Sequence, residues 1–390
     1  MGCYVGVDVA KHFHVAAIVD EAGQVLHTLH FDNNLTGFQR FDQILSSEML
    51  VALEATGHYG NALRDWLLSC GFEVHVFNPL KTNRFRDFNI QWRKNDERDA
   101  IAIAHLLRLG ERQLYHPFPP KSRALRQLVR HRALLVQARA RAKNQLRAML
   151  DEVFPEYQAC ALFSDVFGST SLALLSHYPS PAHLIGLSEA QLASFLSQHS
   201  QGRVKAQRAQ LILEAARQSI GSPAAGEAYA PILPAFVAGY QALTAQIDQS
   251  TTQIEAQLAQ VDQTLTTIPG IGPVLAATIL SEIRHIDRFP SADHLVSFCG
   301  LALSESQSGQ SRTFRFLSRR GSARLRSAFF QAALVAVKYD PHLKSYYQRQ
   351  LQRGRSKRSA VLSTARKLVR ICYALLKSGQ AYQPPNATVG

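Results

Sequence analysis

The sequence predicts an N-terminal α/β unit followed by long helices and a helical C-terminal unit. Three observations indicate this class. β-branched runs alternate with helical stretches over the first 110 residues, two central segments repeat apolar residues at helical spacing, and helix start and stop signals recur towards the end. Because 390 residues exceed what one hydrophobic core usually covers, we expect three parts, at 1–115, 116–265 and 266–390.

The N-terminal part alternates strands and helices. Strands are expected in the β-branched or alternating runs CYVGVDVA, HVAAIVD, GQVLHTLHF, LVALEA and FEVHVFNP. Helices are expected in LTGFQRFDQILSS and in GNALRDWLLSCG, which Gly71 ends, and another begins near Asn95. This order predicts a layered α/β unit with at least one parallel pair of strands.

Two long helices are expected in the middle of the chain. The first, 121–150, has nine lysines and arginines and no acid, and its apolar residues at seven-residue steps are Leu128, Leu135, Ala142 and Met149. The second, 240–265, has the spacing of a coiled coil at Leu243, Ile247, Ile254, Leu258, Val261 and Leu265. An antiparallel pair, within or between chains, would bury both stripes. Between them, 160–235 is expected to be a small helical insertion with a capping box at Ser188 and Gln191.

The C-terminal part is expected to be wholly helical, with one long basic loop. One helix is capped by Ser291 and ends at Gly300, and a later one begins at Asp340-Pro341 and ends near Gly354. The stretch PGIG, 269–272, has two interpretations. It fits the turn of a helix-hairpin-helix, whose second helix would present free amides to a phosphate, and it equally fits a plain turn between helices.

The composition favours a polyanionic partner. Lysine and arginine total 43 against 29 acidic residues, a formal net charge of +14, and such an excess is typical of proteins that bind nucleic acid. No apolar run approaches the ~20 residues that span a bilayer, and the N-terminus lacks a signal sequence, so we expect a cytoplasmic protein with no membrane contact. The five cysteines have no zinc spacing and are expected to be reduced.

Four carboxylates stand out in this basic chain. Asp8 and Glu54 lie where two strands should end, and Asp96 and Asp99 share a face of the helix that begins near Asn95. Ligands of α/β folds bind at the carboxyl edge of parallel strands, so the four acids are expected to meet there. Hard oxygen ligands suit Mg²⁺ or Mn²⁺, and paired ions of this kind act on phosphodiesters. The alternative is that each acid has no catalytic role, because acids are common at strand ends and are stabilised by the helix dipole in the first turn of a helix.

Several basic surfaces accompany these acids. The loop SRTFRFLSRRGSARLR interleaves aromatic residues with candidate phosphate contacts at Arg312, Arg315, Arg319, Arg320, Arg324 and Arg326. A second patch contains Arg355, Lys357 and Arg358, and the basic helix 121–147 forms a third. Three separate basic surfaces fit simultaneous binding of RNA and DNA. The histidines near the acidic motifs, His12, His14 and His58, are expected to be half-buried surface residues and not metal ligands.

The motifs YVGVDVAK, EATGHYG and KNDERDA, in this order, resemble the RuvC-like domain of DEDD transposases of the insertion sequence 110 family. The stretches IPGIGPVLAATIL, FCGLALSESQSGQS and LSRRGSARLR resemble the second, transposase domain of that family. The resemblance therefore covers both ends of the chain. Members of this family are recombinases that a bridge RNA guides, so the resemblance implies a bacterial protein associated with the nucleoid.

This resemblance implies a fold and a set of roles. The N-terminal part would be RNase H-like, with Asp8, Glu54, Asp96 and Asp99 as metal ligands. Ser308 would be the nucleophile that forms a transient phosphoserine link to DNA. The partners would be donor and target DNA, a noncoding bridge RNA and further copies of the chain in a dimer or tetramer. From the residues alone, Ser308-Gly309 is only a polar turn.

Other assignments stay open at this stage. Ser306 and Ser311 lie close enough to Ser308 to confuse the choice of nucleophile, and Tyr346 or Tyr347 would serve in another class of recombinase. A RuvC-like nuclease or Holliday-junction resolvase that uses water would need only the four acids. An RNA-binding or architectural protein would need none of them.

Overall fold

The structure is a computed structural model. It describes residues 2–55, 57–88, 95–118, 120–203, 206–306, 314–317 and 321–384, and the side chains of 86–88, 120–121, 304–306 and 314–317 lie outside this description. The chain divides into two compact units, 1–117 and 118–390. The expected division into three parts remains a prediction.

The five expected strands of the first unit are all present, and helices follow the predicted order. The alternating and β-branched runs pair as strands because side chains on successive residues point to opposite faces of a sheet. The elements are β1 Tyr4–Val9, β2 Phe13–Val19, β3 Val25–Asp32, α1 Leu35–Asp42, β4 Leu50–Glu54, α2 Asn61–Ser69, β5 Val74–Phe77, α3 Pro79–Phe88 and α4 Asp96–Arg108.

These strands form one mixed sheet in the order β3-β2-β1-β4-β5. β1 is antiparallel to β2 and parallel to β4, and β4 is parallel to β5, so the predicted parallel pairing is confirmed. The register places Val7 of β1 opposite Leu53 of β4. Asp8 and Glu54, the next residue of each strand, therefore lie at the carboxyl ends of two neighbouring parallel strands, at the same edge of the sheet.

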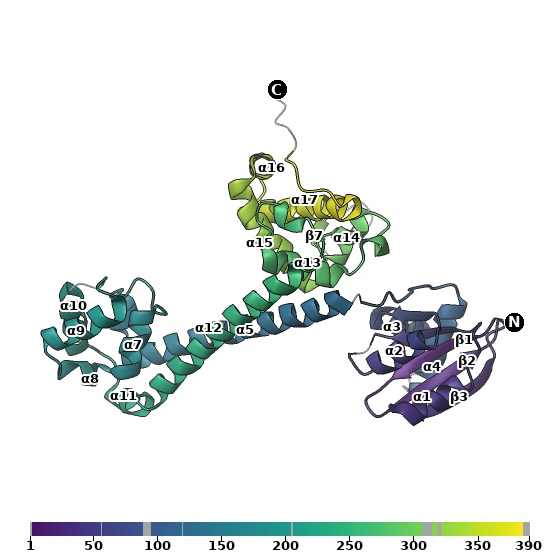
Figure 1. The fold of residues 1–390 in the computed structure, drawn as a ribbon, viewed down its shortest axis with the longest axis horizontal. Helices are drawn as coiled ribbons and strands as arrows, with labels where there is room; N and C mark the ends of the chain where they lie inside the picture. Colours follow the sequence, from purple (N-terminus) through teal and green to yellow (C-terminus); the bar gives the residue numbers. More distant parts are fainter. Residues whose placement is uncertain are drawn as a thin grey trace, which may run out of the picture. The chain divides into compact units, whose positions relative to one another are not determined.

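Helices cover both faces of the sheet (Figure 1). One face packs apolar residues of β1, β4 and β5 against α1 and α2, through side chains such as Phe41, Leu63 and Leu67. The other face packs Ala52 and Phe77 against α4. The first unit is thus a three-layer α/β/α arrangement, which confirms the predicted layered α/β unit.

The second unit consists mainly of helices. They are α5 Pro120–Val153, α6 Glu156–Ala159, α7 Ser169–His177, α8 Pro181–Ile185, α9 Glu189–Ser200, α10 Ala206–Arg217, α11 Pro223–Tyr229, α12 Ile232–Leu258, α13 Pro273–Ile283, α14 Ala292–Phe298, α15 Ala323–Tyr339, α16 Pro341–Gln352 and α17 Lys357–Ser378. Two short 3-10 turns, η1 Leu265–Thr267 and η2 Ile286–Arg288, flank α13. Among the residues that the structure describes, no helix is both long and apolar enough to cross a membrane.

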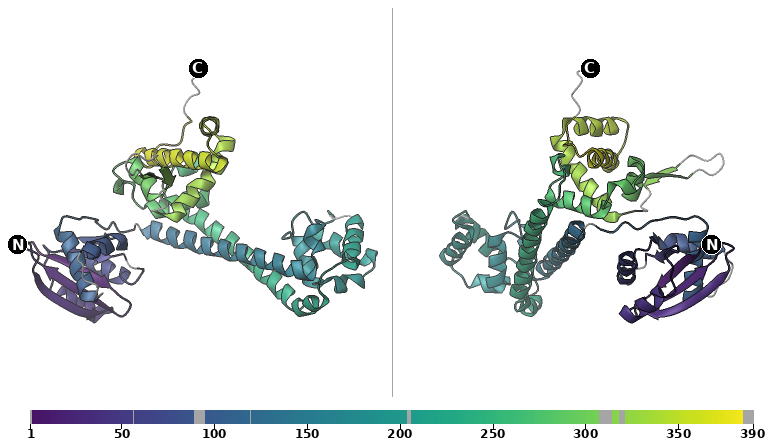
Figure 2. Two further views of the ribbon diagram at one scale, coloured as in Figure 1. Left: turned by 180° about the vertical axis from the view of Figure 1, so that it is seen from behind. Right: turned by 45° about the vertical axis from the view of Figure 1, so that its right-hand side comes forward.

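The long helices α5 and α12 pair within the chain and run antiparallel (Figures 1 and 2). The start of α5 shares a core with the end of α12, where Leu125 and Val129 pack with Ile254 and Leu258. The end of α5 shares a second core with the start of α12 and with the helices α6 to α10. The predicted pairing is therefore confirmed, and it links two hydrophobic cores within one unit.

Two predictions about the second unit are wrong in detail. The helix expected at 240–265 lies instead at Ile232–Leu258, because the periodic apolar residues continue past the end of the helix into η1, where Leu265 is fully buried. The C-terminal part is not wholly helical, since β6 Leu303–Ser306 and β7 Phe314–Leu317 form an antiparallel pair. The run FRFL has the period-two alternation of a strand, which explains this difference.

Candidate functional site: an acidic edge of the sheet

The acids Asp8 and Glu54 lie on the face of the sheet that α4 covers. Gly6, two residues before Asp8, points towards α4, since a Cβ built there would lie 2.1 Å from the carbonyl oxygen of Ala100. Ala52, two residues before Glu54, packs against α4 in the same way. Because residues two apart on a strand share a face, both carboxylates project from the α4 side at the carboxyl ends of β1 and β4.

Asp99 approaches this edge from the helix. It lies in the first turn of α4 and is only 5% exposed. The next residue, Ala100, packs on Val15 of β2, and Val15 is the strand partner of Asp8. Asp96 precedes Asp99 by three residues and is half-buried. The fold therefore brings the positions of Asp8, Glu54 and Asp99 together, with Asp96 one helical turn away.

The start of α4 is fixed by its cap. The side chain of Asn95 accepts a hydrogen bond from the backbone N–H of Glu97 at 3.3 Å, and the acids of the first turn suit the positive end of the helix dipole. This electrostatic role is ordinary for Glu97, whose carboxylate meets His30 at 3.0 Å on the surface. It does not explain why Asp99 is buried against the sheet.

A further polar residue belongs to this edge and was not predicted. Thr82 of α3 is 1% exposed, and its hydroxyl lies 2.9 Å from Oε2 of Glu54 and 3.0 Å from the carbonyl oxygen of Pro79. Asn78 starts α3 directly after β5, accepting from the backbone N–H of Leu80 at 2.9 Å. A helix that begins at the carboxyl edge directs its first-turn side chains to that edge, so the sequence did contain a signal for Thr82.

Carboxylate oxygens are the ligands that hard divalent cations prefer, but these side chains are not gathered around a common point. Over the described part of the chain, no three His, Cys, Asp or Glu side chains are gathered closely enough to hold a metal ion. The backbone thus assembles the positions of acids whose oxygen atoms suit such a cation, and their side chains are not grouped around one point.

His14 does not join this edge. His14 is completely buried on the opposite face, in contact with Phe31 and Phe38 at centroid distances of 5.4 and 6.1 Å. Burial lowers its pKa below the ordinary value of 6.5. His14 is therefore more deeply buried than predicted, whereas His12 and His58 are exposed. Their exclusion as ligands remains a prediction.

Most of the predicted nucleophile loop lies outside the described residues. Ser308 and its neighbour Ser311 are among these, as are Arg312, Arg319 and Arg320. Ser306 and Arg315 lie in β6 and β7, but their side chains are outside the description. Of the other predicted phosphate contacts, Arg326 is half-buried, and the exposed ones are Arg324, Arg355, Lys357 and Arg358.

The basic helix α5 is engaged with its own unit along much of its length. Glu282 of α13 is 8% exposed and meets Arg130 at 2.9 Å and Arg126 at 3.6 Å. Arg132 donates to the hydroxyl of Thr251 at 2.7 Å. These contacts tie α5 to α12 and α13, so part of the predicted third basic surface has a structural role.

The turn PGIG makes close backbone contact with α15. Gly270 has φ +92°, and a Cβ there would lie 2.5 Å from the carbonyl oxygen of Ala332. A glycine is required for both reasons. This contact accounts for the turn without a ligand, and the helix-hairpin-helix reading stays a prediction.

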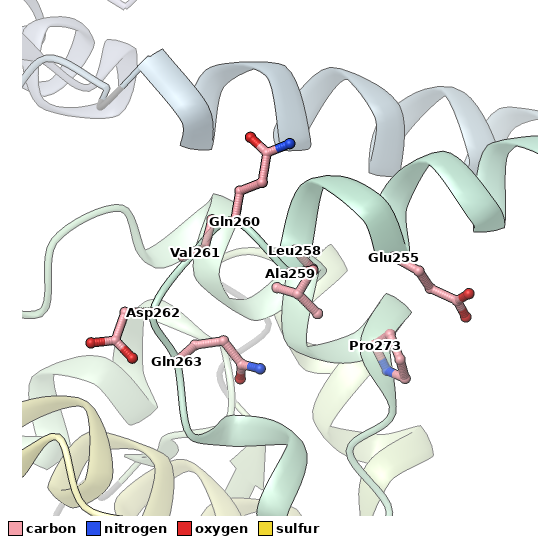
Figure 3. A pocket seen from close by; sticks show the side chains of 8 residues that line it. All are labelled: Glu255, Leu258, Ala259, Gln260, Val261, Asp262, Gln263 and Pro273. Carbon is pink, nitrogen blue, oxygen red and sulfur yellow. The ribbon is translucent and has the colours of Figure 1, made fainter.

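A hollow at the end of α12 is separate from the predicted site residues (Figure 3). Its lining includes the carboxylates of Glu255 and Asp262 and no basic side chain. Figure 3 shows these two carboxylates pointing away from each other. An acidic, open hollow of this kind does not suit a phosphate group.

Comparison with known proteins gives the class and the family. A family model for DEDD transposases of the IS110 type, described as "Transposase", matches residues 5–155. A second model, described as "Transposase IS116/IS110/IS902 family", matches residues 262–348. The first match contains the acidic edge, and the second contains the loop with the predicted nucleophile Ser308.

Curated relatives match nearly end to end. The mini-circle putative transposase for IS117 of Streptomyces coelicolor is 28% identical over 90% of this chain and 88% of its own length. The pilin gene-inverting protein of Moraxella bovis is 24% identical over 97% of both chains. Among solved structures, Thermus thermophilus RuvC in complex with a Holliday junction substrate matches 30% of this chain and all of its own, at 12% identity and a TM-score of 0.23. That score is too low to support a conclusion.

The acidic sheet edge and the two family matches define the class of the protein: it is a transposase, an enzyme that cleaves and rejoins DNA. The more specific assignment follows from the same matches. The chain belongs to the IS110 family of transposases.

Proposed function

We propose that this enzyme is an RNA-guided DNA recombinase that mobilises an insertion sequence. In this proposal a noncoding bridge RNA selects donor and target DNA, and two or four copies of the chain act together. The observation that carries the proposal is the convergence of Asp8, Glu54 and Asp99 at one sheet edge of a protein with net charge +14. A basic protein with a local acidic edge suits an enzyme that holds a phosphate backbone and acts on one of its phosphates.

The first unit is proposed to be RNase H-like. Its mixed five-stranded sheet, in the order β3-β2-β1-β4-β5 and with helices on both faces, supports this assignment. Asp8, Glu54, Asp96 and Asp99 are proposed to hold Mg²⁺ or Mn²⁺ when nucleic acid is bound. Such ions would supply positive charge beside the scissile phosphate.

The proposed nucleophile is Ser308. Its Oγ forms a bond to phosphorus while the bond from phosphorus to the leaving sugar oxygen breaks. The serine proton passes to solvent, and the leaving oxygen takes up a proton. Because a phosphodiester replaces a phosphodiester, an incoming DNA hydroxyl can reverse the link and rejoin the strands. Arg312, Arg315, Arg319, Arg320, Arg324 and Arg326, together with Arg355, Lys357 and Arg358, are proposed to hold the nucleic acid.

A test for the covalent link discriminates between the candidate chemistries. The protein is incubated with its RNA, end-labelled DNA and Mg²⁺, then denatured, and labelled DNA that migrates with protein is measured. We expect an adduct that Ser308→Ala abolishes and that Ser306→Ala and Ser311→Ala retain. Free cut ends without an adduct, and equal cutting by Ser308→Ala, would instead support a nuclease or resolvase that uses water.

Binding of the metal ion has a readout that does not depend on activity. Both tryptophans of the chain, Trp66 and Trp92, lie in the first unit, so their fluorescence reports on its unfolding. A cation that binds only the folded state raises the melting temperature. We expect Mn²⁺ with bound DNA to raise it in the wild type and not in Asp8→Asn. An equal rise in both proteins would remove Asp8 from the metal site.

A further inference from the structure

The helices α16 and α17 concentrate positive charge that the protein does not neutralise. Between Pro341 and Ser378 there is no aspartate or glutamate, and the lysines and arginines are Lys344, Arg349, Arg353, Arg355, Lys357, Arg358, Arg366, Lys367, Arg370 and Lys377. Arg370 pairs with Asp293 at 2.7 Å, and Lys377 pairs with Asp287 at 2.6 Å. Within the described ranges, no carboxylate lies at ion-pair distance from the other eight.

Three of these cations meet around two polar side chains of α16 and α17, which lie side by side (Figure 1). The guanidinium of Arg355 donates to the hydroxyl of Ser363 at 2.6 Å, and that of Arg366 donates to it at 3.4 Å. The ammonium of Lys367 lies 4.7 Å from the ring centroid of Tyr346. The ammonium of Lys367 also donates to Nε2 of His342. Arg355 and Arg366 are therefore held against one hydroxyl group, and Lys367 follows Arg366 on α17.

This arrangement leaves hydrogen-bonding capacity and charge unsatisfied. Burial and then the neighbouring Arg355 lower the pKa of Arg366, and its Nε is buried without a hydrogen-bond partner. Burial and then Arg349 lower the pKa of Lys367. Asp340 offsets only part of this lowering for Lys367, and its carboxylate also accepts from the backbone N–H of Leu343 and from the hydroxyl of Tyr382. An incoming anion would relieve this repulsion.

The start of α17 adds further positive charge to this surface. Ser356 caps the helix, and Lys357 and Arg358 occupy its first turn. Cations are unfavourable at this end of a helix dipole, whereas phosphate groups bind there readily. The exposed basic residues at the start of α17 are therefore placed for an external anion and not for the stability of the helix.

We propose that Arg355, Arg366 and Lys367 form a binding site for the phosphodiester backbone of a nucleic acid. Guanidinium groups match phosphate oxygens in a bidentate manner, and the phosphates supply the missing negative charge. The site includes the sequence-predicted Arg355 and adds two residues that the sequence pattern did not indicate. The inference rests on the proposed nucleic-acid chemistry of the enzyme, but on neither the acidic edge nor Ser308.

The test measures binding by the full-length protein over a series of salt concentrations. Fluorescence anisotropy follows a labelled DNA duplex in one arm and a labelled RNA hairpin in the other. We expect Arg355→Gln and Lys367→Gln each to weaken binding and to lower the slope of log K against log salt by about 1, and the double variant by about 2. The arm in which the slope falls identifies the nucleic acid. Arg217→Gln, which removes an exposed charge of α10, should leave both slopes unchanged.

Unchanged slopes in both arms for the double variant would overturn the inference. Arg355 is exposed, so Arg355→Gln tests the site even where a change at the half-buried Arg366 disturbs folding. Failure here is distinct from failure of the proposed recombinase chemistry. A double variant with unchanged slopes that still forms the DNA adduct would refute only this site, whereas reduced slopes without any adduct would refute only the serine chemistry.

Discussion

Replacing Gly6 with alanine tests how closely the acidic edge depends on the packing of β1 against α4. A Cβ at this position would lie 2.1 Å from the carbonyl oxygen of Ala100 and 2.3 Å from the backbone nitrogen of Ala104. Non-bonded contacts need about 3.5 Å, so α4 must retreat by more than about 1 Å. Both obstructing atoms belong to the backbone of the helix, so no side chain can rotate away. We expect a loss of about 3 kcal/mol in the free energy of unfolding, the upper part of the range for overpacking.

Urea unfolding followed by tryptophan fluorescence measures this loss in the first unit alone, because both tryptophans lie there. With a urea slope of about 2 kcal/mol per molar, the midpoint should fall by about 1.5 M. Strand cleavage should fall too, since Asp99 moves with α4 away from Asp8. The control is Gly239→Ala in α12, where a new Cβ meets nothing within 4 Å; because it lies in the second, mainly helical unit, its midpoint is followed by circular dichroism and should not change. An unchanged midpoint for Gly6→Ala would refute the reasoning.

Four further predictions follow from the same structure. Thr82→Val should lower strand cleavage about tenfold by releasing Glu54, and Thr82→Ser should restore it; equal rates would exclude this positioning role. Glu282→Ala should cost about 3 kcal/mol, because it removes the buried carboxylate that two partly buried arginines contact, and a calorimetric melting temperature equal to that of the wild type would contradict this. Burial raises the pKa of Cys299 to about 12, so mass spectrometry after iodoacetamide treatment of the folded protein should find it unmodified and the exposed cysteines modified. Because burial lowers the pKa of His14, the unfolded chain binds more protons, so stability should fall as the pH decreases through about 6.5, and unfolding curves of His14→Phe should show a weaker fall.

Much of the fold followed from local patterns. The five strands of the first unit were predicted because each carries a β-branched or alternating run between turn residues, and their order along the chain already required a parallel pair. The C-terminal end of α12 was misplaced because Leu265 continues the apolar period after the helix has stopped. The spacing of apolar residues indicates which positions are buried, and a buried residue in a 3-10 turn can continue that spacing as well as a residue in a helix. The strands β6 and β7 have four residues each. Alternation over so few residues is a weak signal for a strand, so the basic composition of this segment led to the prediction of a loop.

The candidate site was predictable only in part. Strand-end positions for Asp8 and Glu54, and a shared helix face for Asp96 and Asp99, follow from the sequence. The close approach of α4 to β1 could not be predicted. It depends on the absence of a side chain at Gly6, and only the contact between these two distant segments shows that a side chain there would not fit. Charge partners were hidden for the same reason. The arginines of α5 read as a free basic surface until α13 brings Glu282 to them.

The central claim is that the acids of β1, β4 and α4 act as one unit on DNA, and cleavage of a labelled strand by carboxamide variants tests it most directly. Residues that act as a unit have strongly non-additive effects. We expect Asp8→Asn and Asp99→Asn each to abolish measurable cleavage while DNA binding persists, the double variant to be no worse, and Asp42→Asn on α1 to cleave normally. Near wild-type cleavage by either single variant, with the protein folded, would contradict the claim.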